Sequence, residues 1–159
     1  MSVTVLQRQP RALRRRPGDR TWRRWTVAWL GGAGLGVLNG AVREVLYADR
    51  VGDRTANQIS AATLVLLLAA YFRELDRRWP IATAHEAREI GATWAALTVG
   101  FEFLFGHYVD GDSWSELLEN YDLTGGHLWI LVLAWIGVGP SVIHAARLRR
   151  TVRNEGGRS

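Results

Sequence analysis

The placement of arginine constrains the fold of this chain more than any other feature of its sequence. All twenty basic residues are arginine, and none of them lies between Arg88 and Arg147. Long apolar segments fill and flank that stretch, although the mean hydropathy of the whole chain is close to zero. Apolar segments bounded by basic residues are typical of membrane proteins, because basic connections stay on the cytoplasmic side. The pattern therefore predicts an integral membrane protein and not a nucleic-acid-binding one.

Four segments are long enough to cross the hydrocarbon core of a bilayer as helices, which takes about 20 residues. We predict membrane spans at residues 25–47, 55–75, 84–108 and 127–147. They belong to a single domain, residues 21–150, between a disordered basic tail at 1–20 and a second tail at 151–159. The expected fold class is all-α, a four-helix transmembrane bundle.

A fifth, shorter helix is expected between the third and fourth spans, at about residues 113–121. Ser113 and Glu116 have the spacing of a capping box, in which each side chain bonds the main chain of the other. The apolar residues that follow recur at helical spacing, with acids on the opposite face. A segment too short to span and apolar on one face predicts an amphipathic helix at the membrane interface.

The arginines also predict the orientation. The first tail, the 73–88 connection and the last tail are rich in arginine, whereas the 109–126 connection is acidic and has none. We therefore expect a multi-pass protein of the bacterial inner membrane with both termini in the cytoplasm. Trp22, Trp25 and Trp29 are expected to form an aromatic belt at its inner interface. The expected partners are the lipid bilayer and either further copies of the chain or another membrane protein, with no nucleic acid.

Two of the predicted spans carry a face of small residues. In the first span these are Gly32, Gly36 and Gly40. In the third span they are Gly91, Ala95 and Gly106. Small residues at such spacing let membrane helices approach closely, so we expect both faces to contact a neighbouring helix. Glu102 lies on the second face.

Three charged residues lie inside the predicted spans: Arg43, Glu44 and Glu102. A charge at the centre of a membrane helix costs about 2.5–3.5 kcal/mol on insertion scales, so each needs a partner or a function. Arg43 lies 18 residues after Trp25 and Glu102 lies 16 residues after Glu86, so both fall toward the external end. We predict that Arg43 and Glu102 form an ion pair there. The candidate ligand- or ion-binding residues are Arg43, Glu44, Glu102, Asn39, Gln58 and His107.

Metal, cofactor and catalytic chemistry receive little support from the sequence. There is no cysteine, and the weak metal-ligand candidates His107, Asp110 and His127 do not have the spacing of a metal motif. No nucleophile elbow, zinc-protease motif or nucleotide-binding loop is present, so we expect no cofactor.

Three stretches, Asn39-Gly40-x-x-Arg43-Glu44, Phe101–Tyr108 and Ser113-Trp114, together resemble a group of small, uncharacterised bacterial four-span membrane proteins. The resemblance implies four spans over about residues 25–145, and it implies no catalytic or binding residue.

Three classes of function remain open. The first is a structural or accessory membrane protein, held together by an Arg43–Glu102 pair. The second is a small oligomeric transporter or channel that uses the polar cluster as an ion, proton or ligand site. The third is a membrane-embedded enzyme acting on a lipid-phase substrate. A cluster open to outside water favours the second class, and a sealed cluster favours the first.

Overall fold

The expected all-α fold is confirmed by a computed structural model, which describes residues 18–111, 113–119 and 128–156. The α-helices are α1 (Gly18–Leu46), α2 (Ala48–Val51), α3 (Asp53–Arg78), α4 (Ala84–Phe105), α5 (Trp114–Glu119) and α6 (Trp129–Gly156). A single π-helical turn, η1 (Gly106–Asp110), continues α4. No strand occurs among the described residues.

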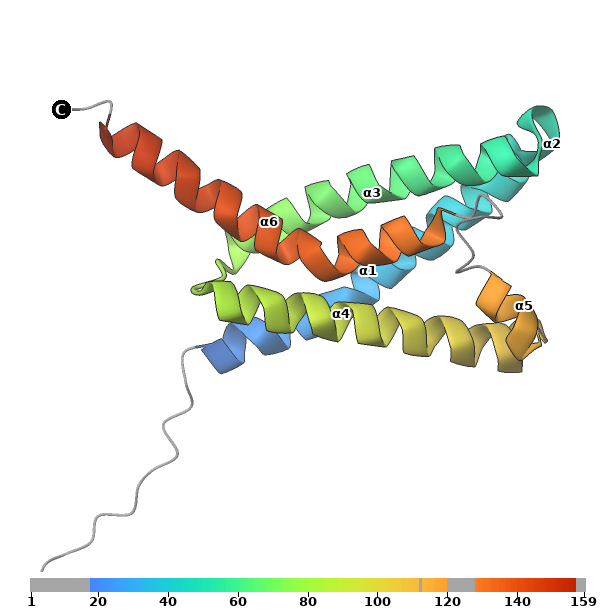
Figure 1. The fold of residues 1–159 in the computed structure, drawn as a ribbon, viewed down its shortest axis with the longest axis horizontal. Coiled ribbons are helices and arrows are strands. Elements are labelled where there is room, and N and C mark those ends of the chain that lie inside the picture. The colour runs from blue at the N-terminus through green and yellow to red at the C-terminus, as the bar shows by residue number, and fades with distance from the viewer. Residues whose placement is uncertain (1–17, 112, 120–127, 157–159) are drawn as a thin grey trace, which may run out of the picture.

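The four long helices pack as a ring. α1 contacts α3 and α4, and α6 contacts the same two helices from the other side of the bundle. The main chains of the opposite pairs, α1 with α6 and α3 with α4, do not approach each other within the described residues. In Figure 1, the first half of α6 accordingly lies in front of the middle of α1, with α3 above it and α4 below it. The residues between α3 and α4 must therefore cross the end of the bundle diagonally.

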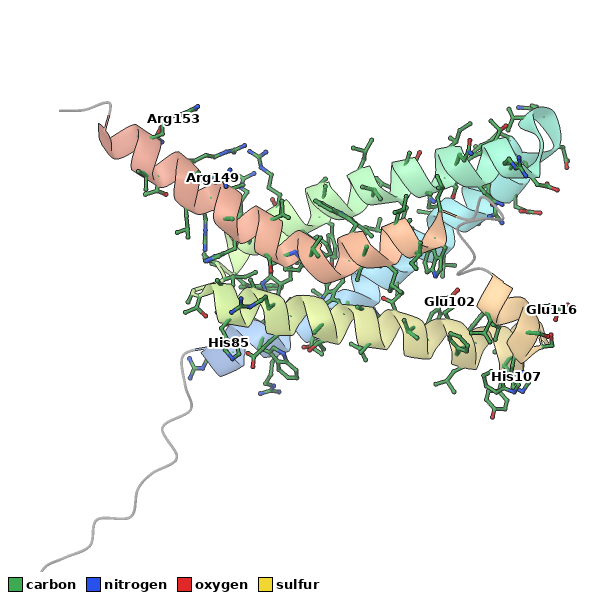
Figure 2. The ribbon with its side chains drawn as sticks, in the orientation of Figure 1. His85, Glu102, His107, Glu116, Arg149 and Arg153 are labelled. Carbon is green, nitrogen blue, oxygen red and sulfur yellow. The ribbon has the colours of Figure 1, made fainter. Side chains whose placement is uncertain are left out.

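The two ends of the bundle differ in character. At the arginine end, α1 begins, α3 ends and α4 begins; the α2 end carries α2, η1 and α5 (Figure 1). α6 contains Pro140, bends near its middle and projects beyond the bundle at the arginine end (Figure 1). Proline bends a helix because it lacks the main-chain N–H and crowds the preceding turn. Figure 2 shows His85 and Arg153 at the arginine end, and Glu102, His107 and Glu116 toward the α2 end.

Aromatic rings fill the core at the arginine end. Trp25, Phe72 and Trp94 are buried together, with ring centroids 5.0–6.3 Å apart. Each indole N–H is satisfied, since Trp94 donates to the main-chain oxygen of Trp25 (2.9 Å) and Trp25 donates to that of Trp79 (3.1 Å). The expectation that Trp25 belongs to an interfacial belt is therefore wrong, because its ring packs inside the bundle.

A buried ion pair fixes the diagonal connection between α3 and α4. The Asp76 carboxylate, on α3, lies 3.3 Å from the Arg147 guanidinium on α6 and accepts a hydrogen bond from the main-chain N–H of Ile81 (3.1 Å). Arg147 also donates to the main-chain oxygen of Ile81, whose side chain is fully buried. These bonds link α6 to the end of α3 and to the connection that follows it.

Glycines behave differently on the two small-residue faces. A Cβ placed on Gly91 of α4 would lie 1.9 Å from the carbonyl oxygen of Gly137 on α6, so the expected close approach is present there. On α1, a Cβ on Gly32 would meet the Trp94 ring at 2.6 Å, but one on Gly36 or Gly40 would meet nothing within 4 Å. Within the described part of the chain, no helix makes the expected contact at Gly36 and Gly40, because α1 leaves open space beside them.

Two of the described helices, α3 and α6, are long and apolar enough to cross a membrane. Only 28% of the most apolar window of each is buried inside the protein, so these helices are not the enclosed core of a globular fold. α1 and α4 carry exposed apolar side chains as well, including Val27, Leu30, Val45 and Leu104. An apolar outer surface of this extent is typical of a protein whose solvent is lipid.

Candidate functional site

The main candidate site is a cavity of about 670 Å³ that lies between α1, α3, α4 and α6, on the α2 side of the aromatic core. Its deepest part is apolar and is formed by Leu64, Leu68, Trp94, Val132 and Ile136. Gly36 and Gly40 face it from α1, so the missing side chains of these glycines create part of its volume. Its polar lining residues include Asn39, Arg43, Glu44, Asp53, Asn57, Ser60, Thr98 and Glu102.

Asn39 joins α1 to α3 on one side of the cavity. Its side-chain amide donates to both the main-chain oxygen (3.0 Å) and the hydroxyl oxygen (2.7 Å) of Ser60. Both residues are buried, so these bonds satisfy groups that would otherwise be desolvated without a partner. Asn39, one of the predicted ligand-binding candidates, thus lines the cavity while its amide nitrogen is bonded to α3.

Arg43 lies one helical turn further toward the α2 end. Its guanidinium donates to the Asn57 side-chain oxygen on α3 (2.6 Å) and to the carboxylate of Glu44 (3.2 Å). The Arg43 side chain is 35% exposed and that of Glu44 is 70% exposed, so the cavity reaches the surface of the bundle here. The predicted ion pair with Glu102 is not made; Asn57 and Glu44 take its place.

The register of α1 against α4 explains why Arg43 and Glu102 do not meet. The Trp29 indole N–H on α1 donates to the Thr98 hydroxyl on α4 (3.0 Å), so these two positions lie at one level. At a rise of 1.5 Å per residue, Arg43 lies about 21 Å beyond that level and Glu102 only about 6 Å beyond it. Counting each residue from the start of its own span predicted similar depths, because that count ignores how far α1 extends past α4.

Glu102 instead faces α6. Its carboxylate accepts a hydrogen bond from the indole N–H of Trp129 (2.7 Å), the first residue of α6. The side chain is half-buried and lines the cavity between its apolar floor and the Arg43 level. The prediction that Glu102 lies on a helix-packing face is therefore consistent with its position. The role of Trp129 was missed, since a tryptophan near a helix start gives no sign of its partner.

The other predicted site residues lie elsewhere. Gln58 is exposed and does not line the cavity. His107, in η1, stacks its ring on that of Trp114 with centroids 4.0 Å apart and is also absent from the cavity lining. Among the residues described, no group of three His, Cys, Asp or Glu side chains could hold a metal ion. The metal prediction also named Asp110, whose side chain is outside the described part of the chain, and His127, which is outside it entirely.

The charges around the cavity are unequal. In the described lining, Arg43 is the basic residue, whereas Glu44, Asp53 and Glu102 are acidic. Arg43 and Glu44 form an ion pair at 3.2 Å, and Glu102 accepts the hydrogen bond from Trp129. The lining also includes the aromatic rings of Trp29, Trp94, Phe101, Phe105 and Trp129. By formal charge, the described part of the lining is thus apolar, aromatic and net negative.

Comparisons with protein-family models, with curated proteins and with solved structures find no match to this chain. The geometry and chemistry of the cavity therefore carry the functional argument.

Proposed function

We propose that this chain is a four-span protein of the bacterial inner membrane that binds a small lipophilic cation in the cavity between its helices, as a transporter-type binding site. The observation that carries the proposal is the combination of an apolar, aromatic-lined cavity with three carboxylates and one guanidinium in its described lining. An organic cation with apolar substituents matches both properties.

The proposed membrane placement has two supports. Apolar side chains are exposed on all four long helices, which lipid would cover. Arginines gather where α1 begins and α3 ends, so the positive-inside rule places the arginine end in the cytoplasm. The cavity mouth at Arg43 and Glu44 then faces outward, while the aromatic core and the Asp76–Arg147 pair close the inward side.

This topology is tested by reporter fusions placed after Arg54 and after Pro80. The proposal expects an external reporter in the first fusion and a cytoplasmic one in the second. The reverse pattern would overturn the orientation, and a cytoplasmic location for both would overturn the four spans.

Selection for a cation follows from the electrostatics of the lining. Opposite charges interact more strongly in the weakly polar interior of a bundle than in water. The Glu102 carboxylate lies between the apolar floor and the mouth, where a ligand reaching the floor would pass it. Aromatic faces add about 0.5–2 kcal/mol each for a cation held over a ring. A lipophilic anion would meet the same apolar floor but repulsive carboxylates.

The cavity favours a binding function over a purely structural one. A bundle whose polar residues only hold helices together gains stability by filling its interior, because empty volume forfeits dispersion contacts. Here α1 carries glycine at both Gly36 and Gly40, where an added Cβ would meet nothing within 4 Å. In a purely structural protein, a helix of a partner or of another copy would instead fill this space. The binding experiment below distinguishes the binding function from the structural one.

The experiment measures binding of tetraphenylphosphonium, a lipophilic cation, to the purified full chain in detergent by equilibrium dialysis. Gly36→Leu places a side chain in the cavity and should weaken binding at least tenfold. The matched control is Gly34→Leu, on the same helix, where an added Cβ also meets nothing within 4 Å and the residue is not in the cavity lining. Gly34→Leu should bind as the unmodified chain does.

Glu102→Gln tests the charge. The amide oxygen of glutamine can still accept the Trp129 hydrogen bond, so the variant removes the charge and keeps the contact. We expect at least a tenfold weaker affinity, which corresponds to about 1.4 kcal/mol, and thermal unfolding of the same variant checks that it folds. Unchanged affinity in both Glu102→Gln and Gly36→Leu would refute the proposal. Absence of cation binding, with co-purification of a protein partner that Gly36→Leu releases, would support the structural reading.

A further inference from the structure

A second cavity, of about 520 Å³, lies at the arginine end between the first turns of α1 and the last turns of α3. Arg20, Arg23 and Arg24, here named the α1 arginines, line one side of it. Arg78, Glu74 and Trp79 line the other side, from α3 and the residue that follows it. This cavity is separate from the one discussed above, and the proposed cation site does not use it.

The charges around the second cavity are strongly unequal. The only carboxylate in its described lining, that of Glu74, lies 2.7 Å from the Arg78 guanidinium and 3.7 Å from that of Arg77. The α1 arginines make no ion pair with any described residue; Arg24 lies over the Trp79 ring at 5.7 Å from its centroid. Among the side chains that the structure describes, three guanidinium groups therefore share one cavity without a carboxylate of their own.

Helical spacing brings these groups together. Residues three and four positions apart lie on one face of a helix, so Arg20 is a neighbour of both Arg23 and Arg24. Like charges on one face repel each other unless an anion binds between them. The apolar part of the lining consists of Val27 and Ala28 of α1 and Leu75 of α3, of which Ala28 and Leu75 are buried and Val27 is exposed. The cavity thus offers a cationic rim above an apolar floor.

We propose that this second cavity binds the phosphate group of an anionic membrane lipid. Guanidinium groups bind phosphate oxygens through paired hydrogen bonds, and several of them around one site match a phosphodiester. The apolar floor fits the part of a lipid next to its phosphate, and a free phosphate ion has nothing to place there. Basic cavities between helices at the cytoplasmic interface are the usual place for such headgroups. The inference uses the proposed membrane orientation but is independent of the cation site.

The test uses the full chain, purified in detergent and mixed with equal amounts of phosphatidylglycerol and phosphatidylcholine. Native mass spectrometry then measures which lipid stays bound. We expect one phosphatidylglycerol to be retained in preference to phosphatidylcholine. Replacing all three α1 arginines by glutamine should reduce that retention at least tenfold. The matched control replaces Arg149, Arg150 and Arg153 by glutamine, an equal charge change on the part of α6 that projects from the bundle (Figure 2).

A second set of variants guards against a change of membrane topology, because arginine also sets orientation. Replacing the α1 arginines by lysine keeps the charge but removes the planar, paired donors, so retention should fall while the chain still inserts correctly. Equal loss of lipid from the α1 variant and the α6 control would show diffuse attraction and overturn the proposal. So would retention unchanged in both α1 variants, or displacement of the lipid by millimolar inorganic phosphate, which would indicate a free-phosphate site. Failure of the cation-binding experiment leaves this prediction unchanged.

Discussion

Replacing Gly91 by alanine should weaken the bundle where α4 crosses α6. The added Cβ would lie 1.9 Å from the carbonyl oxygen of Gly137, whereas ordinary contact begins at 3.4 Å. The obstacle is main chain, so the helices themselves must separate by about 1.5 Å, the difference between those distances. A gap of 0.5–1 Å already forfeits a quarter to a half of a dispersion contact, so the whole crossing is affected.

The size of the effect combines two terms of opposite sign. Overpacking an interior typically costs about 1–3 kcal/mol, and the upper value applies where main chain must move. Alanine in place of glycine stabilises a helix by at most about 1 kcal/mol, because of its higher helix propensity. We therefore expect a net loss of about 2 kcal/mol, or a midpoint lowered by about 4–8 °C by analogy with soluble domains of this size.

The assay is thermal unfolding of the purified chain in detergent, followed by tryptophan fluorescence. Two controls carry the same glycine-to-alanine change. At Gly100, also on α4, a Cβ meets nothing within 4 Å; at Gly137 it meets only the Ala95 Cβ, at 3.9 Å. Both controls should unfold at or above the normal midpoint. A Gly91→Ala midpoint equal to theirs, or a Gly137→Ala midpoint lowered as much, would refute the packing argument.

Two further predictions concern hydrogen bonds at the α2 end. Asn39→Leu removes both hydrogen bonds to Ser60 and leaves the buried carbonyl and hydroxyl of Ser60 without the Asn39 donor, so the free energy of unfolding should fall by about 1–3 kcal/mol. An unchanged midpoint of thermal unfolding would contradict this stabilising role of Asn39. The pKa of Glu116 is lowered from its ordinary value of 4.5, because its carboxylate interacts with the side chain and main-chain N–H of Ser113. The lowered pKa means that this bond stabilises α5 above about pH 4.5 and is lost as the pH falls further. Amide hydrogen exchange in α5, corrected for its intrinsic pH dependence, should therefore accelerate at low pH in the unmodified chain but not in Glu116→Gln. Equal acceleration in both chains would contradict a stabilising role of the Glu116 carboxylate.

Much of the fold is accessible from the sequence, because it depends on local patterns. The capping box at Ser113 and Glu116 forms as expected, with hydrogen bonds of 2.7 and 3.3 Å between the two residues. Thr83 likewise accepts a bond from the main-chain N–H of Glu86 (3.1 Å) at the start of α4. Long apolar runs predicted the four long helices, since their length and composition do not depend on tertiary contacts.

The candidate site is less accessible, because it depends on how far each helix slides along its neighbour. The Trp29–Thr98 hydrogen bond fixes that register for α1 and α4, and it separates Arg43 from Glu102. A spacing rule cannot foresee this, since tryptophan serves equally at a membrane interface and inside a core. The same rule cannot tell a glycine that receives a neighbouring helix, such as Gly91, from one that leaves a cavity, such as Gly36.

The contacts that close the arginine end were also beyond sequence reasoning. Asp76 and Arg147 lie 71 positions apart, each among other charged residues. Their separation in sequence gives no sign of the 3.3 Å contact, and the surrounding charges predict only a solvated interface. The diagonal path of the α3–α4 connection brings them together, and that path follows from the packing of all four helices.

Charge selectivity of the cavity tests the central claim most directly. Tetraphenylphosphonium and tetraphenylborate have nearly the same shape and apolar surface but opposite charge, so their affinities differ mainly through the electrostatics of the site. With the purified chain at neutral pH, we predict that the cation binds at least tenfold more tightly than the anion, and that Glu102→Gln narrows this ratio. Equal affinities, or tighter binding of the anion, would contradict a site built for a lipophilic cation.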